Sequence, residues 1–297
     1  MFVITMLCSP ERPALDPELV NAIRNAWGGG DVVWLALDEV AEFRVLNQPV
    51  NQWEVWSDCQ KMGVDLIVQQ TINRRKSMLI ADMDSTLIHQ ECIDELAAEA
   101  GVGERVADIT ARTMNGELEF ETALQERVAL LAGLDTYVIT KVLAERITYM
   151  PGGKTLVATM KANGAYAALV SGGFTVFTSE VADVLGFDEH RSNTLLVADG
   201  KLTGHVGDPI LGRDAKVTAL KEITQRLSIN PNDVIAVGDG ANDLGMLDMA
   251  GMGVALHAKP SVAAQCDIRI NHGDLTALLY LQGYGRDEFV KTDSEPA

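Results

Sequence analysis

Cysteine is scarce in this sequence, with only 4 residues in a chain of 297. Cys8, Cys59, Cys92 and Cys266 show no C-x-x-C spacing, which argues against a zinc site and against a disulfide framework. Proline is scarce as well, at 9 residues, whereas 47% of the residues are hydrophobic. We therefore expect four reduced cysteines and a globular fold that is stabilised by a sizeable hydrophobic core.

Long apolar runs and basic residues are also lacking. No run approaches the roughly 18 residues of a membrane span, and the first residues have no basic leader, so we expect a cytoplasmic protein. Only 24 Lys and Arg residues oppose 42 Asp and Glu residues, which gives a formal net charge of -18. Such a surface repels nucleic acid and anionic membranes, and neither is expected as a partner. A negatively charged substrate would need a metal ion and a few well-placed cations.

The first 73 residues predict a small domain with the order strand, helix, strand, strand, helix, strand. This order is the split βαβ pattern of a ferredoxin-like fold, and in topology it resembles ACT-type regulatory domains. Such a domain could bind a metabolite such as serine, mediate a homodimer, or only stabilise the chain. The predicted strands are Phe2–Leu7, Asp31–Leu37, Ala41–Leu46 and Val64–Thr71, and the helices begin after Asp16 and Asn51.

A second domain is predicted over residues 74–285. The basic stretch Arg74-Arg75-Lys76 is interpreted as a solvated linker, followed by the short apolar strand Met78–Ala81. Apolar residues then recur at helical spacing over about residues 89–150, which predicts a helical cap inserted after the first strand. Strands and helices alternate from Pro151 onward, which is typical of a parallel, Rossmann-like sheet with helices on both faces. Two further short strands are expected over His190–Val197 and Lys201–His205, where they could pair as a hairpin flap, and residues 286–297 are expected to form a loose tail.

Polar groups follow three of the predicted strands. Asp82 and Asp84 end the first, Ser171 follows the second, and Asp239, Asn242 and Asp243 follow another. Because ligands bind beyond the carboxyl ends of parallel strands, we expect these groups to share one crevice. Carboxylates held this close repel one another unless a cation neutralises them, and oxygen ligands without a nearby His or Cys favour Mg²⁺. The pattern predicts metal-assisted phosphoryl transfer, in which Asp82 attacks and Asp84 serves as general acid and base.

Four motifs carry a resemblance to a known family, namely DMDSTLI at Asp82–Ile88, SGG at Ser171–Gly173, Lys216 within GRDAK, and GDGANDLGML at Gly238–Leu247. In order and spacing they resemble the haloacid dehalogenase superfamily of phosphatases, in particular its members that hydrolyse phosphoserine in the last step of serine biosynthesis. The resemblance implies that Asp82 is the nucleophile and Asp84 the acid and base. It also implies a set of binding residues: Asp82, Asp239 and the backbone carbonyl of Asp84 for Mg²⁺, Asp243 as a support of the metal, and Ser171, Gly172, Lys216 and Asn242 for the phosphoryl group and the nucleophile.

The resemblance also assigns substrate-reading residues to the cap, namely Glu91, Met114, Phe120 and Arg127. Phosphoserine carries an ammonium and a carboxylate, for which Glu91 and Arg127 are suitable partners. One departure is Gly245, where relatives commonly have proline. Two alternatives remain open at this stage: a phosphatase or phosphotransferase for another small phosphomonoester, and a receiver module that is phosphorylated without turnover.

Overall fold

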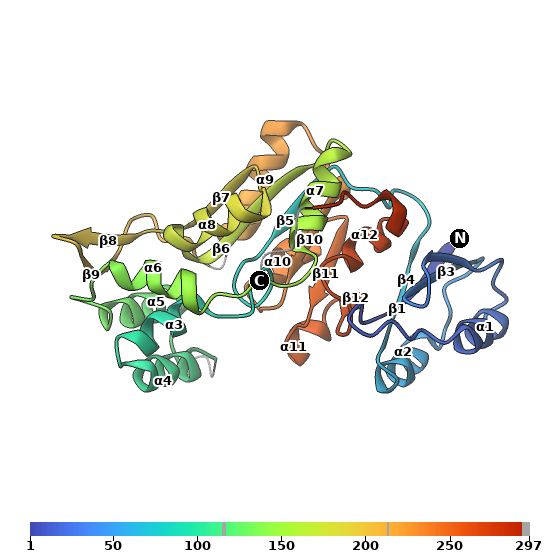
Figure 1. Ribbon diagram of the computed structural model, residues 1–297, viewed down its shortest axis with the longest axis horizontal. Helices are drawn as coiled ribbons and strands as arrows, with labels where there is room; N and C mark the ends of the chain where they lie inside the picture. Colours follow the sequence, from blue (N-terminus) through green and yellow to red (C-terminus); the bar gives the residue numbers. More distant parts are fainter. Residues whose placement is uncertain (115–116, 213, 293–297) are drawn as a thin grey trace.

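The computed structural model describes residues 1–114, 117–212 and 214–292. A small sheet with two helices lies at one end of the molecule, a larger sheet flanked by helices lies in the middle, and a helical block lies at the other end (Figure 1). We call these parts the N-terminal unit, the parallel domain and the cap. Within the three described ranges, no helix is both long and apolar enough to cross a membrane.

The N-terminal unit confirms the predicted order of elements. Its four strands form one antiparallel sheet in the order β2-β3-β1-β4, as in a ferredoxin-like fold. Asp16 caps the first helix by accepting a hydrogen bond from the Glu18 N–H, and Pro17 occupies its first turn. The elements are β1 (Phe2–Cys8), α1 (Pro17–Ala26), β2 (Val33–Ala36), β3 (Val40–Val45), α2 (Gln52–Lys61) and β4 (Val64–Gln70).

The parallel domain confirms the Rossmann-like prediction. Six parallel strands lie in the order β12-β11-β10-β5-β6-β7, with β5 between the two halves of the sheet. Every residue of β5 is buried, as expected for a strand covered on both faces. The strands are β5 (Met78–Ala81), β6 (Tyr166–Phe174), β7 (Glu189–Asn193), β10 (Val234–Gly238), β11 (Met252–Leu256) and β12 (Ile268–Ile270). The flanking helices are α7 (Gly153–Ala162), α8 (Thr175–Leu185), α9 (Ala215–Leu227), α10 (Leu244–Met249), α11 (Pro260–Ala263) and α12 (Ala277–Leu281).

Within its described residues, the cap consists of four helices, α3 (Cys92–Glu99), α4 (Gly103–Met114), α5 (Phe120–Ala129) and α6 (Tyr137–Glu145). A hairpin of β8 (Leu195–Ala198) and β9 (Lys201–Val206) packs against it. The predicted hairpin with Lys201–His205 is confirmed, since β8 pairs with β9. The bounds of its first strand are wrong, because His190–Val197 is divided between β7 in the parallel sheet and β8 in the hairpin. Backbone hydrogen bonds from Gly133 to Leu202 and from Thr136 to Gly200 tie the hairpin to the cap.

The prediction of a solvated linker is wrong for Arg74 and Lys76, which lie in an interface, whereas the side chain of Arg75 is 49% exposed. Arg74 pairs with Glu42 at 2.8 Å, and the side chains of both are only 13% exposed. Lys76 is 7% exposed and donates a hydrogen bond from Nζ to the carbonyl of Asn232. The predicted loose tail is wrong for its first residues, since Arg286 pairs with Glu39 and Phe289 packs on Tyr280. Residues 293–297 lie outside the described part of the chain.

Two buried acids fix the N-terminal unit on the parallel domain. The Glu39 carboxylate accepts a hydrogen bond from the Tyr280 hydroxyl at 3.1 Å. The Asp65 carboxylate, which is fully buried, accepts from three successive backbone N–H groups of residues 271–273 at 2.9 to 3.1 Å. Apolar residues of both parts, including Leu7, Ile67 and Leu278, belong to one continuous core. The N-terminal unit is therefore docked on the parallel domain rather than loosely tethered to it.

We expect Asp65→Ala to lower the free energy of unfolding by about 1–3 kcal/mol or more, because it leaves buried backbone N–H groups without acceptors. Urea unfolding of the full chain would measure this loss. The matched control is Asp58→Ala in the same unit, since Asp58 is 63% exposed and makes only a surface ion pair with Lys61. Equal stability of the two variants would show that Asp65 does not hold the interface.

Candidate functional site

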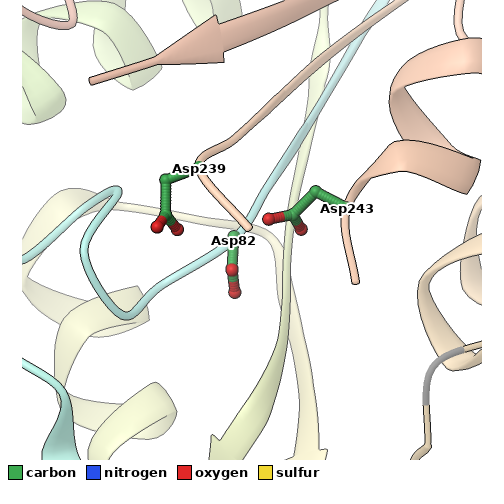
Figure 2. Close-up of side chains that lie close together, drawn as sticks. All are labelled: Asp82, Asp239 and Asp243. Atoms are coloured by element: carbon green, nitrogen blue, oxygen red, sulfur yellow. The ribbon is translucent and has the colours of Figure 1, made fainter. Parts of the chain in front are cut away.

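Three aspartates meet beyond the carboxyl ends of adjacent strands. Asp82 follows β5, Asp239 follows β10, and Asp243 precedes α10; one carboxylate oxygen of each lies within 4.8 Å of the others. Figure 2 shows the three side chains gathered around one point, with Asp82 between the other two in this view. All three are at most 6% exposed. Strand order reverses at β5, so the sheet itself forms the crevice that collects them.

Lys216, the second residue of α9, lies between two of these acids. Its Nζ is 2.7 Å from Asp82 Oδ2 and 2.5 Å from Asp243 Oδ1, and the lysine is only 3% exposed. Burial alone would lower the pKa of Lys216, but the carboxylates of Asp82 and Asp243 raise it above its usual value. The lysine therefore stays charged and fixes the position of the Asp82 carboxylate.

One lysine does not balance this group of acids. Burial, followed by the charge of Asp243, raises the pKa of both Asp82 and Asp239. Within the described ranges Asp239 has no ion pair, and its Oδ1 accepts a 3.4 Å hydrogen bond from Thr86. Both oxygens of Asp243 are engaged, one by Lys216 and one by the Gly240 N–H. Both oxygens of Asp82 are engaged as well, by the Met83 N–H and by Lys216. An excess of buried negative charge with oxygen-only donors fits a metal ion, and Asp239 is the acid least engaged by donors among the described residues.

Asp84 is held between the cap and the parallel domain. Its Oδ1 accepts a 3.0 Å hydrogen bond from the Cys92 N–H, and its Oδ2 accepts a 3.4 Å bond from the Ser171 hydroxyl. Burial raises the pKa of Asp84, whereas the hydrogen bonds from Cys92 lower it. A Cβ at Gly173 would lie 2.7 Å from Asp84 Oδ2, so only glycine leaves room for this carboxylate. Asp84 is thus fixed beside Asp82 with a raised pKa, as a proton-transfer group requires.

The phosphate-binding residues predicted from the sequence lie around these aspartates. Ser171 is 2% exposed and, with Gly172, belongs to β6 rather than to a turn after the strand. Phe120 of the cap approaches Gly172, since a Cβ there would be 3.2 Å from the ring. Asn242 folds back over the loop, where a Cβ at Gly240 would lie 2.4 Å from its Oδ1. The structure therefore brings Ser171 to Asp84 and Lys216 to Asp82, with Gly172 next to Ser171 in β6 and Asn242 in the loop between Asp239 and Asp243.

Glu91 and Arg127 face the same crevice from the cap. Glu91 precedes α3, and its Oε1 accepts a 3.1 Å hydrogen bond from Ser85. Desolvation by the surrounding protein raises the pKa of Glu91 to about 7, and the negative charges of Asp84 and Asp239 contribute to this rise. Burial lowers the pKa of Arg127, against the opposing charges of Asp94, Glu91 and Asp84. Within the described residues the guanidinium of Arg127 has no ion pair, and its Nε donates to the Ala123 carbonyl.

Two other positions named from the sequence are Gly245 and Met114. Gly245 lies in α10, where a Cβ would come within 2.7 Å of Val217 Cγ2 on α9. Glycine thus permits close packing of the two helices beside Lys216. The side chain of Met114 lies outside the described residues.

Sequence reasoning missed Cys92 and Thr86, both of which bond to the site acids. Cys92 is the first residue of α3, and N–H groups in the first turn of a helix have no partner within the helix. The sequence did contain a signal for Cys92, because a helix was predicted to begin just after an acidic loop. The N-terminus of a helix stabilises a nearby carboxylate, so a bond from its first N–H groups to Asp84 could have been predicted. Thr86 gave no comparable signal in the sequence.

Comparisons with known proteins agree with this geometry. A family model described as haloacid dehalogenase-like hydrolase matches residues 79–248. The phosphoserine phosphatase of Streptomyces coelicolor is 42% identical over 240 residues, which cover 80% of this chain but only 58% of that protein. The chain thus spans less than two thirds of this relative.

Solved structures extend the comparison to the whole chain. A hydrolase of Salmonella enterica serovar Typhi matches 95% of this chain and 98% of its own, with a TM-score of 0.85 and 28% identity. A phosphoserine phosphatase with an analogue of the phospho-aspartyl intermediate matches 69% of this chain and 98% of its own, with a TM-score of 0.65 and 41% identity. The first of these likenesses includes the N-terminal unit.

Proposed function

Because the chain belongs to the haloacid dehalogenase-like hydrolases, we propose that it hydrolyses O-phospho-L-serine to L-serine and inorganic phosphate. The observation that carries this proposal is that Glu91 and Arg127 lie on the cap side of the crevice, where Ser85 of the Asp82–Ile88 loop bonds to Glu91 and the charge of Asp84 acts on both side chains. An acid, and a guanidinium that has no ion pair within the described residues, suit the ammonium and the carboxylate of a phosphorylated amino acid. The relatives at 41–42% identity are phosphoserine phosphatases, which supports the same substrate.

The reaction proceeds in two steps on this chain's own residues. A carboxylate oxygen of Asp82 attacks phosphorus, the bond between phosphorus and the serine oxygen breaks, and Asp84 gives its proton to that oxygen. The product on the enzyme is an aspartyl phosphate at Asp82. Asp84 then takes a proton from water, which attacks phosphorus and releases inorganic phosphate, so that both aspartates return to their starting states.

Binding groups hold the phosphoryl oxygens and the nucleophile. We assign this role to Ser171, the Gly172 N–H, Lys216 and Asn242. Ser171 bonds to Asp84 and Lys216 pairs with Asp82, while Gly172 and Asn242 are adjacent in the chain to Ser171 and Asp243. Asp82, Asp239 and the backbone carbonyl of Asp84 would hold Mg²⁺, which when bound offsets the negative charge of the phosphoryl group. Asp243 supports this arrangement through Lys216 and the Gly240 N–H.

The N-terminal unit has a separate proposed role. Its antiparallel sheet and order of elements resemble an ACT-type domain, and we propose that it binds a small effector such as L-serine. Isothermal titration of the full chain with L-serine, compared with glycine, measures that binding when it is carried out on Arg127→Ala, in which product binding at the phosphatase site is weakened. Absence of heat with L-serine would contradict it without bearing on the phosphatase activity.

A phosphate-release assay over a panel of phosphomonoesters tests the proposed function. We expect many turnovers with phosphoserine in Mg²⁺, none with chelator, and slower release from esters without an amino acid. One phosphate per protein without further turnover would instead indicate a receiver-like acceptor. Faster turnover of another ester would reassign the substrate.

We expect Arg127→Ala to raise KM for phosphoserine about 10- to 100-fold, because a charged hydrogen-bonding partner of its carboxylate is lost. For a phosphate ester without a carboxylate, KM should change little. Arg105→Ala is the matched control, since Arg105 is exposed on α4 and lines a hollow to which neither Glu91 nor Arg127 contributes. An equal rise in KM for both esters would show that Arg127 does not bind the carboxylate of phosphoserine.

A further inference from the structure

Asn193, at the end of the edge strand β7, is a buried polar residue that no sequence motif singled out. It is 1% exposed, and its side-chain amide makes three hydrogen bonds. Nδ2 donates to the carbonyl of Gly172 at 2.9 Å and to the carbonyl of Leu211 at 3.4 Å. Oδ1 accepts from the Leu211 N–H at 2.7 Å. One amide therefore joins two segments that are about 40 residues apart in the chain.

The first of these segments carries phosphoryl-binding groups. Asn193 holds the carbonyl of Gly172, while the next N–H, that of Gly173, donates to Ser171 Oγ at 2.9 Å. The peptide between Gly172 and Gly173 is thus fixed at both ends. Its orientation determines where the Ser171 hydroxyl and the Gly172 N–H are directed, because rotating one peptide moves both of its neighbours.

The second segment leads to the buried lysine. Leu211 lies five residues before Lys216, in the stretch that connects the β8–β9 hairpin to α9. Both backbone polar groups of Leu211 bond to Asn193. Asn193 is itself held in place, since Thr175 Oγ1 donates to the backbone carbonyl of Asn193 at 2.8 Å. Asn193 therefore links the segment of β6 that carries Ser171 to the segment that leads to Lys216.

We propose that Asn193 is a positioning residue that sets the spacing between the phosphoryl-binding groups on β6 and those at the start of α9. It touches neither substrate nor metal and acts through Gly172 and Leu211. The proposal rests on the proposed function, because it assumes that Ser171, Gly172 and Lys216 hold a phosphoryl group. It predicts weaker binding of phosphate itself, whatever alcohol the phosphate is attached to.

The test uses two variants of the full chain. Asn193→Asp keeps nearly the same shape and an acceptor for the Leu211 N–H, but loses the donor to the Gly172 carbonyl. Asn193→Leu removes all three bonds without adding charge. The control is Thr178→Val, since Thr178 is fully buried and bonds to His190 and Ser192 on the same strand without contacting Gly172 or Leu211. Thermal denaturation and the inhibition constant of inorganic phosphate are measured for each protein.

We expect both Asn193 variants to raise the inhibition constant of inorganic phosphate about 10- to 100-fold. The value of kcat/KM should fall by the same factor for phosphoserine and for an ester without an amino acid. Thr178→Val should lower the melting temperature while leaving the inhibition constant of inorganic phosphate unchanged.

Unchanged phosphate inhibition in folded Asn193→Asp would overturn the positioning role, as would failure of both Asn193 variants to fold. If Thr178→Val raised the inhibition constant of inorganic phosphate as much as the Asn193 variants do, the rise would result from general packing and the positioning role would likewise be overturned. A wild-type protein that releases phosphate from no ester would instead reject the proposed function, so the two failures are distinguishable.

Discussion

Asp84→Asn is expected to lower kcat for phosphoserine about 10²- to 10⁴-fold while leaving the protein folded. The amide oxygen of asparagine can still accept the hydrogen bond from the Cys92 N–H, so the link between the cap and the acidic loop survives. Asparagine has no proton to give to the departing serine oxygen at neutral pH and cannot take one from water. Both steps of the proposed reaction are therefore slowed by the same change.

Steady-state phosphate release and circular dichroism check this expectation together. Asp108→Asn serves as the control, because Asp108 is an exposed acid on the cap helix α4 and has the same change in charge. The control should keep the wild-type rate. A folded Asp84→Asn protein with wild-type kcat would remove Asp84 from proton transfer.

Lys216→Met is expected to cost both stability and activity. The substitution leaves Asp82 and Asp243 buried without their shared cation, and breaking a buried ion pair in this way costs about 3–5 kcal/mol. It also releases the nucleophile, since Lys216 Nζ is the group that fixes Asp82 Oδ2 at 2.7 Å. Urea unfolding in chelator should show the loss of stability, and the release assay should show the loss of turnover.

The control for this prediction is Lys61→Met, because Lys61 forms an exposed ion pair with Asp58 whose removal should change stability little. Mg²⁺ should restore part of the stability of Lys216→Met, because it offsets the same carboxylates. Wild-type stability of Lys216→Met without metal would contradict the ion-pair network described here.

Much of the fold could be predicted because its signals are local. The apolar strand Met78–Ala81, the helical spacing of the cap and the βαββαβ order of the N-terminal unit depend on neighbouring residues, and the structure confirms all three. The convergence of Asp82 and Asp239 was also predictable, because the carboxyl ends of parallel strands meet at one edge of a sheet.

Errors arose where a residue's partner lies far away in the chain. Arg74 and Lys76 appeared to form a solvated linker because their partners, Glu42 and the Asn232 carbonyl, are 32 and 156 residues distant. The tail was expected to be loose for the same reason, although Arg286 meets Glu39 across 247 residues. Composition alone does not distinguish a solvated cation from one that is paired by packing.

By itself, the sequence was enough to predict the candidate residues for the chemistry, because strand ends and motif spacing place acids, a serine and a lysine at one edge of a parallel sheet. Only the tertiary structure decided which partner each of these groups has. It placed Lys216 between Asp82 and Asp243, held Asp84 by the N-terminus of α3, and joined Gly172 to Leu211 through Asn193. These pairings depend on the packing of distant segments and on the exclusion of water between them, which no local pattern encodes.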